Sequence, residues 1–324
     1  MAASPARSPL RIAIMTDETG WHTATLKQAL RKRGCEGRCV DLADCRIDTT
    51  WAWHGLVIPG YGRALPDAVI VRGLASGSFE QVTLRLGILH ALRELGVPVY
   101  NDARAIERSV DKGMTSFLLH LAGIPTPATW VSESAPHAQR TVMRESAAGR
   151  ALVLKPLFGS QGKGLQRIGM VEAGHAPVPL PALAAYRHVA YLQRFAPSPA
   201  APGKPGFDWR VLVVGGRAVA AMRRVSQGWI HNVAQGARCE HADITPALAA
   251  LAVRATEALG LDYAGVDLVP VGEGEDTDQA MVIEVNGVAA WHGLQSVTAV
   301  DIAGLLVDDL LKRKLPAARQ GAVA

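Results

Sequence analysis

Residues 155–164, KPLFGSQGKG, decide how the rest of this 324-residue sequence is interpreted, because they place a glycine-rich loop directly after an apolar segment. The residues just before them, 151–154, read ALVL and predict a buried strand. Glycine permits loop conformations in which backbone N–H groups point at phosphate oxygens, and Lys155 and Lys163 add positive charge. The residue order matches neither the P-loop nor the Rossmann fingerprint. Taken alone, the segment is compatible with a phosphate-binding loop and with a plain β-turn.

Oxygen-bearing side chains gather on two predicted strands closer to the C-terminus, 264–271 and 280–285. Asp267 lies on the first strand, and Glu284 and Asn286 are two positions apart, so that their side chains share one face of the second. Mg²⁺ typically takes one or two carboxylates together with phosphates and water. The pattern therefore predicts a divalent metal site, with a salt-bridged pair of strands as the alternative.

The expected register brings the two carboxylates together. If residues 272–279 connect the strands, Val271 pairs with Ala280 and Asp267 falls opposite Glu284. Like charges directly opposite one another destabilise a sheet. A cation or a basic partner is therefore expected beside them.

Arginines flank a predicted hairpin whose two-residue turn is Gly215-Gly216. Arg210 lies before the turn and Arg223 and Arg224 lie after it. Arginine binds phosphate or carboxylate through a planar fork, although each of these residues is also compatible with a solvated edge charge. The apolar segment 191–195, YLQRF, is compatible with a strand that lines an adenine pocket through its backbone, or with a simple inter-domain strand.

Alternating strand and helix patterns predict an α/β protein, with an α+β arrangement in the C-terminal half. Short apolar runs and amphipathic stretches alternate up to about residue 105. The predicted divisions are an N-terminal α/β domain, a central subdomain with the glycine-rich loop, a C-terminal subdomain with the metal site and a loose tail: 1–108, 109–190, 191–316 and 317–324.

Composition excludes several classes of protein. Hydrophobic residues make up 49% and charged residues 19%, which favours a folded chain over a disordered one. The net charge is +5, but the basic residues are scattered, so nucleic acid is not the expected partner. No window approaches the roughly 20 apolar residues of a membrane span, and residues 1–9 lack the apolar run of a secretory signal. We therefore expect a cytoplasmic protein. Its cysteines have no zinc-site spacing and are expected to be reduced thiols: Cys35, Cys39, Cys45 and Cys239.

Taken in order along the chain, these motifs resemble those of the RimK-like glutamate ligases of the ATP-grasp superfamily. The resemblance runs from about residue 69 to residue 311 and extends more loosely over the N-terminal domain. It is carried by Lys112 in SVDKGMTSFLL, KPLFGSQGKG, QRF, DWR followed by RR, GVDL and EVN. It implies an ATP-grasp fold preceded by a Rossmann-like pre-ATP-grasp domain.

The resemblance also implies roles for individual residues. The expected nucleotide-binding residues are the phosphate lysines Lys112 and Lys155, the loop residues Ser160, Gln161 and Gly162, the adenine hinge Gln193 and Phe195, and Lys204 and Asp208 near the ribose. The expected metal ligands are Asp267, Glu284 and Asn286. The expected catalytic residues are Arg224, which would steady the acyl-phosphate, with Arg210 nearby and Lys155.

The implied activity is ATP-dependent addition of L-glutamate to a carboxylate through an acyl-phosphate, with two Mg²⁺ or Mn²⁺ ions. Two departures from the family pattern bear on it. Arg194 stands in the hinge where an acidic residue is commoner, and residues 287–295, GVAAWHGLQ, replace the usual small-residue ending. The latter segment resembles the branch that glutamylates tetrahydromethanopterin, so a small pterin acceptor is expected. Its Trp291 is compatible with stacking on that acceptor or with packing in the core.

Two alternatives remain. One is a ligase acting on a protein tail or an amino-group carrier protein, and the other is a non-catalytic ATP-binding module. The intact set Asp267, Glu284 and Asn286 argues against the module. A homo-oligomer is compatible with the sequence.

Overall fold

A computed structural model of the chain describes residues 8–159, 161–197, 204–271 and 279–321. The chain divides into two units, each considered separately below. The first unit comprises Met1–Ile106, Val288–Gln295 and Ala299–Ala324, and the second comprises Glu107–Gly287 and Ser296–Thr298. No helix in the described part of the chain is long and apolar enough to cross a bilayer.

The first unit is built on a four-stranded parallel sheet with the order β2-β1-β5-β6. Strands β1, β5 and β6 are apolar and almost wholly buried, as is usual for a parallel sheet covered on both faces, whereas the edge strand β2 is buried only at Val40. The elements of its N-terminal part are β1 (Arg11–Met15), α1 (Trp21–Lys32), β2 (Glu36–Val40), η1 (Leu42–Asp44), β3 (Arg46–Ile47), β4 (Leu56–Val57), β5 (Ala68–Val71), α2 (Phe79–Glu94), β6 (Val99–Tyr100) and α3 (Ala103–Val110), whose last residues enter the second unit.

The order of this sheet reverses between β1 and β5. From β1 the chain passes through α1 to β2 on one side, and from β5 it passes through α2 to β6 on the other. The carboxyl ends of β1 and β5 therefore form a topological switch point, the place where open parallel sheets commonly bind ligands.

The C-terminal helices belong to this first unit, which differs from the predicted subdomain 191–316. Helix α8 buries Ile302 and Leu306 and packs on α1, and Arg33 of the loop after α1 donates to Asp308 at 2.7 Å. The predicted loose tail is also wrong in part, because helix continues to residue 321. The elements are α7 (His292–Gln295), α8 (Ile302–Asp309), the π-helical turn η4 (Leu310–Lys314) and α9 (Leu315–Gly321).

The second unit contains two antiparallel sheets. The smaller has the order β7-β10-β8-β9, and helix α5 covers it. The glycine-rich segment connects β8 to β9 within this sheet. The elements are α4 (Lys112–Leu121), β7 (Thr129–Ser132), α5 (Ala135–Ala147), β8 (Ala151–Lys155), β9 (Gln166–Gly169), η2 (Leu183–Tyr186) and β10 (Ala190–Arg194).

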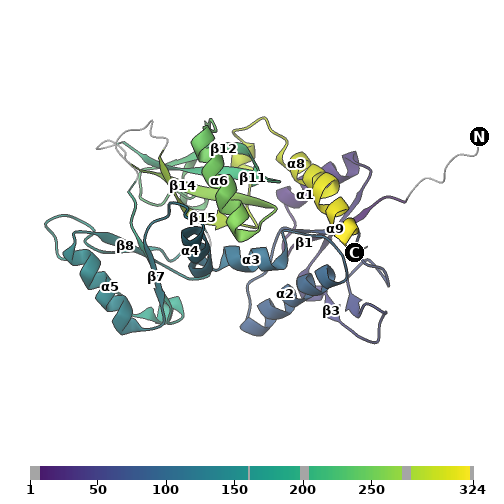
Figure 1. Cartoon of the computed structure of the whole chain (residues 1–324), viewed down its shortest axis with the longest axis horizontal. Coiled ribbons are helices and arrows are strands. Elements are labelled where there is room, and N and C mark those ends of the chain that lie inside the picture. Colours follow the sequence, from purple (N-terminus) through teal and green to yellow (C-terminus); the bar gives the residue numbers. More distant parts are fainter. Residues whose placement is uncertain (1–7, 160, 198–203, 272–278, 322–324) are drawn as a thin grey trace, which may run out of the picture. The chain divides into compact units, whose positions relative to one another are not determined.

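The larger sheet of the second unit has the order β13-β12-β11-β14-β15, and helix α6 lies across it (Figure 1). The Gly215-Gly216 turn joins β11 to β12, as the sequence predicts, and both glycines have positive φ, which a type I′ turn requires. The elements are β11 (Gly206–Val214), β12 (Arg217–Ser226), η3 (Val233–Gln235), β13 (Arg238–Ala242), α6 (Pro246–Leu259), β14 (Tyr263–Pro270) and β15 (Ala280–Asn286).

A β-bulge sets the register of β14 and β15. Ala280 pairs with Pro270 and not with Val271, so the ladder begins one residue away from the predicted register. An irregularity between Asp267 and Leu268 then restores the pairing of Asp267 with Glu284. The predicted opposition of the two carboxylates is confirmed, although the sequence contains no signal for the bulge that produces it.

Candidate active site

A cavity of about 360 Å³ in the second unit collects most of the residues that the sequence singles out. Its wall includes residues of β8, β10, β11, β12, β14 and β15. The predicted site residues on its wall are Lys112, Lys155, Gln161, Gly162, Gln193, Phe195, Lys204, Asp208, Arg224, Asp267 and Glu284. Arg210 and Asn286 are not among its lining residues, and Ser160 lies outside the described residues.

The two predicted phosphate lysines lie in the same cavity wall. Lys112 follows Asp111, which caps α4 by accepting from two backbone N–H groups. Its Nζ donates to the Gly159 carbonyl at 2.6 Å and lies 3.3 Å from Glu284 Oε1. Lys155 Nζ donates to Gln193 Oε1 at 2.6 Å. Burial lowers the pKa of Lys155 to about 8, and the neighbouring charge of Glu284 opposes that shift.

The glycine-rich loop lies against the segment that follows β12. Gly162 has φ +68°, and a Cβ there would lie 3.0 Å from Ile230 Cγ2. Gln235 Nε2 donates to the Gln161 carbonyl at 3.2 Å. Position 162 therefore favours glycine both for its backbone conformation and for this close approach.

The hinge residues of β10 have partners of their own. Gln193 is 2% exposed and its amide bridges Lys155 and Thr129, so its side chain faces the lysine. The Phe195 N–H donates to the Ala151 carbonyl at 2.9 Å. Arg194, the departure from the family pattern, donates to Glu145 at 2.8 Å. Its charge is therefore already paired with a carboxylate of α5, the helix that covers the smaller sheet.

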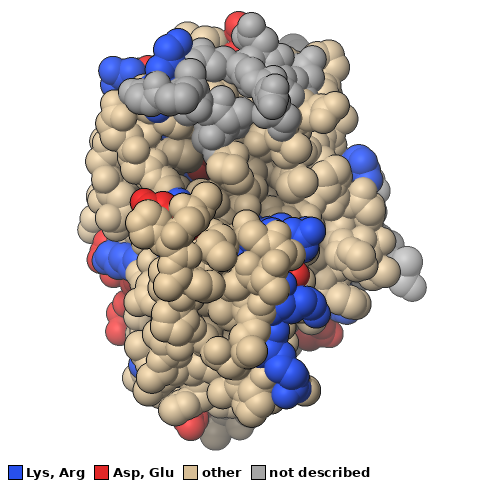
Figure 2. Space-filling view, turned by 90° about the vertical axis from the view of Figure 1, so that its left-hand side faces the viewer, with Lys and Arg blue, Asp and Glu red and all other residues tan. Residues whose placement is uncertain are grey.

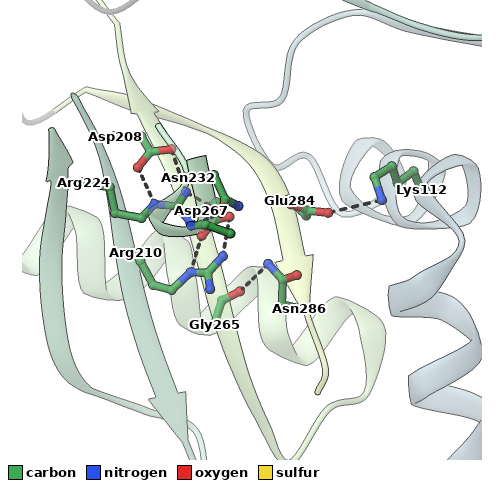
Figure 3. A network of polar contacts seen from close by, with 10 residues as sticks. Lys112, Asp208, Arg210, Arg224, Asn232, Gly265, Asp267, Glu284 and Asn286 are labelled. Atoms are coloured by element: carbon green, nitrogen blue, oxygen red, sulfur yellow. Dashed lines mark hydrogen bonds and ion pairs between the residues drawn. The ribbon is translucent and has the colours of Figure 1, made fainter. Parts of the chain in front are cut away.

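A chain of buried ion pairs crosses β11, β12 and β14 (Figure 3). Arg224 donates through Nε and Nη2 to both oxygens of Asp208, at 2.7 and 2.6 Å, and lies 3.1 Å from Asp267. Arg210 donates to both oxygens of Asp267 at 2.6 Å. Burial alone would raise the pKa of Asp267, but Arg210 and Arg224 lower it below its ordinary value. Asp208 thus lies on the wall as the partner of Arg224, whereas the resemblance places it near the ribose.

The donor set fits a divalent cation at Asp267 and Glu284. Both carboxylates line the cavity, and the Glu284 side chain is 31% exposed. A carboxylate has about four lone-pair positions, and the hydrogen bonds of Asp267 and Glu284 do not fill them. Asn286 donates through Nδ2 to the Gly265 carbonyl at 3.3 Å (Figure 3), so Oδ1 is the atom that it would offer to a cation. In the described part of the chain no three Asp, Glu, His or Cys side chains converge, so the site has two carboxylates and at most this amide.

Four further side chains line the cavity and were not predicted. Arg167 lies 5.1 Å from the ring centre of Phe195 and 5.5 Å from that of Trp229, while His231 and Asn232 follow along the chain. Burial, reinforced by Arg224, lowers the pKa of His231 to about 4, so this imidazole is neutral at pH 7. The segment QGWIHN after β12 lacks periodicity, and its proximity to the glycine loop became evident only from the fold.

Positive charge predominates on the cavity wall. Seven Lys and Arg residues line it against three Asp and Glu residues. Figure 2 shows Lys and Arg side chains gathered in a band along one side of the molecular face that it views. The excess of positive charge on the cavity wall attracts polyphosphate anions.

Comparisons with known proteins agree with this geometry. A model of the RimK-like ATP-grasp domain matches residues 109–310, and one of the RimK PreATP-grasp domain matches residues 10–106. The chain is 33% identical over 307 residues to tetrahydromethanopterin:alpha-L-glutamate ligase of Methanococcus maripaludis, covering 93% of this chain and 98% of that one. It is 30% identical over 312 residues to probable alpha-L-glutamate ligase 1 of Hahella chejuensis, covering 94% and 95%.

A solved structure shares the fold. The ATP-grasp ligase PsnB, in a complex with a precursor variant, Mg and ADP, superposes with a TM-score of 0.66 at 23% identity and covers 96% of this chain and 99% of its own. The predicted ATP-grasp fold with its N-terminal pre-ATP-grasp domain is confirmed. This chain belongs to the RimK-like ATP-grasp family.

Proposed function

We propose that this protein is an ATP-dependent carboxylate–amine ligase that adds L-glutamate to a pterin acceptor of the tetrahydromethanopterin type. The observation that carries the proposal is the convergence of Lys155, Asp267 and Glu284 on one cavity. Relatives named for this reaction, such as the Methanococcus maripaludis protein, support the choice of acceptor.

The residues of the cavity suit activation of a carboxylate. A carboxylate needs a leaving group before an amine can replace its oxygen, and phosphorylation by ATP supplies one. Negative charge then gathers on the transferring phosphoryl oxygens. Lys155 and Arg224 lie on the wall to stabilise it, and a divalent cation held by Asp267 and Glu284 would add further positive charge. Removing one such fixed charge typically costs about 10²- to 10³-fold in rate.

We assign the two arginines different parts in this reaction. Arg224 lines the cavity, whereas Arg210 is not among its lining residues and places both donors on Asp267. Arg224 is therefore the residue proposed to contact the acyl-phosphate. Arg210 is a positioning residue that orients the Asp267 carboxylate.

The glycine-rich loop supplies water exclusion. Gln161 and Gly162 line the cavity and lie against Ile230 and Gln235 of the segment after β12. An acyl-phosphate is lost to hydrolysis when water reaches it, so a closed loop favours attack by the amine of glutamate.

The test is a transfer assay with purified protein, ATP, Mg²⁺, L-glutamate and tetrahydromethanopterin as the acceptor. We expect ADP to form in a one-to-one ratio with an acceptor heavier by one glutamyl residue, as measured by mass spectrometry. Glu284→Gln should abolish transfer while leaving the circular dichroism spectrum unchanged, because it removes one metal-binding charge from an otherwise intact strand.

Parallel reactions separate this proposal from its alternatives. Peptides with acidic C-termini and an amino-group carrier protein replace the pterin in two of them. Modification of a protein acceptor but not of the pterin would contradict the proposed substrate. ATP binding without ADP formation under any condition would identify a non-catalytic module. Titration of Mg²⁺ and Mn²⁺ in the same assay counts the ions required.

A further inference from the structure

An aromatic cluster lies in the first unit at the switch point of its parallel sheet. We define it as Trp21, His22, Trp291, His292 and Arg72. Trp21 and His22 begin α1, which follows β1, and Arg72 directly follows β5. Trp291 and His292 belong to the segment that leaves Asn286 at the end of β15. Two strand ends that border the switch point therefore contribute to one group of side chains.

The cluster has a buried part and an exposed part. Trp291 is 1% exposed, so its indole packs in the core and offers no face to a substrate. His22 holds it in place, because His22 Nε2 accepts from the Trp291 backbone N–H at 3.1 Å and the two rings meet edge to face at 4.6 Å. Trp21 is 38% exposed, and its ring centre lies 4.6 Å from that of the exposed His292. The accessible aromatic surface is therefore the Trp21–His292 pair.

Arg72 gives the cluster an uncompensated positive charge. Its guanidinium stacks on Trp291 at 4.5 Å and donates to the Ala289 carbonyl at 2.7 Å. Within the described residues it has no carboxylate partner within 4.0 Å, and its Nε is buried without a hydrogen bond. Burial, reinforced by Arg72, lowers the pKa of His22 to about 4, so that this neighbour is neutral at pH 7. A cation held beside neutral aromatic rings favours an anionic ligand.

We propose that this cluster is a binding site for the acceptor, taking a flat aromatic ring system on the Trp21–His292 pair and an acidic group of the same molecule at Arg72. The inference rests on the proposed function for the identity of the acceptor. Stacking on an indole and an imidazole suits a pterin ring, and a carboxylate or phosphate on its side chain suits the guanidinium.

Kinetics with the pterin acceptor test the stacking surface. Trp21→Ala and His292→Ala should each raise the KM for the acceptor by about tenfold, while the KM values for ATP and glutamate stay within twofold. Trp53→Ala is the matched control, because Trp53 belongs to the same unit and is 86% exposed outside the cluster. Unchanged acceptor KM values in both cluster variants would overturn the inference while leaving the glutamate ligase intact.

Equilibrium binding tests the charge without turnover. Titration of the pterin acceptor in the absence of ATP should quench tryptophan fluorescence in the wild type and much less in Trp21→Phe. Arg72→Lys should keep the affinity within threefold, whereas Arg72→Met should lower it at least tenfold. Arg72→Met should leave unchanged the affinity for 6-methyltetrahydropterin, which lacks an acidic group.

The two proposals fail in different ways. A wild-type chain that binds the pterin through Trp21 but transfers no glutamate contradicts the proposed function and keeps the cluster. A chain that transfers glutamate with equal pterin affinity in the wild type, Trp21→Ala and Arg72→Met contradicts the cluster and keeps the function.

Discussion

Lys155 shows how burial alters a single charged group in the cavity. Its pKa is lowered to about 8 from 10.5, so the ligand-free chain loses this charge as the pH rises through about 8. Bound phosphates stabilise the protonated form, so nucleotide binding above that pH takes up a proton. Between pH 8 and 10.5 Lys155 is protonated more fully in the unfolded chain than in the folded one. The free-energy cost of burying Lys155 on folding therefore falls as the pH rises through this window.

We therefore expect the affinity for ADP to decrease by up to tenfold per pH unit above about pH 8. Isothermal titration between pH 6.5 and 9.5 measures it. Lys155→Met should bind ADP more weakly at pH 7 and show a flatter profile above pH 8. Parallel profiles for the two proteins would show that another group causes the decrease.

Single residues differ in how far the sequence could predict them. Lys112, Lys155 and Glu284 could be identified from short sequence motifs, and the structure brings all three to one cavity. The separate positions of Arg210 and Arg224 depend on which strands neighbour each other, so the sequence grouped them together. The sequence did not single out Trp21. Helical periodicity predicts which side of a helix is buried, but it does not show which side chains of that helix lie beyond the end of a neighbouring strand.

At the scale of elements, the glycine-rich loop packs against the segment that follows β12. Gly162→Ala should disturb it, because the residue has positive φ and Ile230 lies close to the added methyl group. The left-handed conformation alone costs an alanine about 1–2 kcal/mol. We expect kcat for glutamyl transfer to fall at least tenfold and ADP formation to exceed glutamyl transfer, because water gains access.

Gly174→Ala is the matched control for this change. Gly174 also has positive φ but no atom within 4 Å of the added methyl group, and it does not line the cavity. The ratio of ADP to transferred glutamate should stay near one in that variant. Equal ratios in the two variants would show that the Ile230 contact has no part in excluding water.

The pairing of Asp267 with Glu284 could be predicted from the sequence, but the strand register that leads to it could not. Asp267 lies opposite Glu284 as expected, but the ladder reaches this pairing through a shift at Pro270 and a compensating bulge. Alternation of residue types specifies which side chains share a face, and it does not locate an extra residue within a strand.

At the scale of the whole molecule, the division into two units predicts where nucleotide acts. ADP with Mg²⁺ should slow amide exchange in residues 155–164 and 227–232 and leave β1 and β5 unchanged. Ligand at 100 times its Kd stabilises the binding state by about 2.7 kcal/mol. Hydrogen-exchange mass spectrometry with and without ADP checks this, and protection confined to β1 and β5 would contradict the nucleotide site.

The membership of the C-terminal helices could not be predicted. An amphipathic pattern shows that α8 must cover an apolar surface, but it does not identify which one. In the structure Ile302 and Leu306 are buried and Arg33 pairs with Asp308. These contacts make α8 part of the first unit.

The return of α8 to α1 has a consequence for biogenesis. During synthesis on the ribosome, the second unit leaves the exit tunnel before α8, which packs on α1 from much later in the chain. Domains generally fold as they emerge, so the second unit can fold while the part of α1 that α8 covers is still exposed. During that interval the exposed apolar surface of α1 would be available for chaperones to bind.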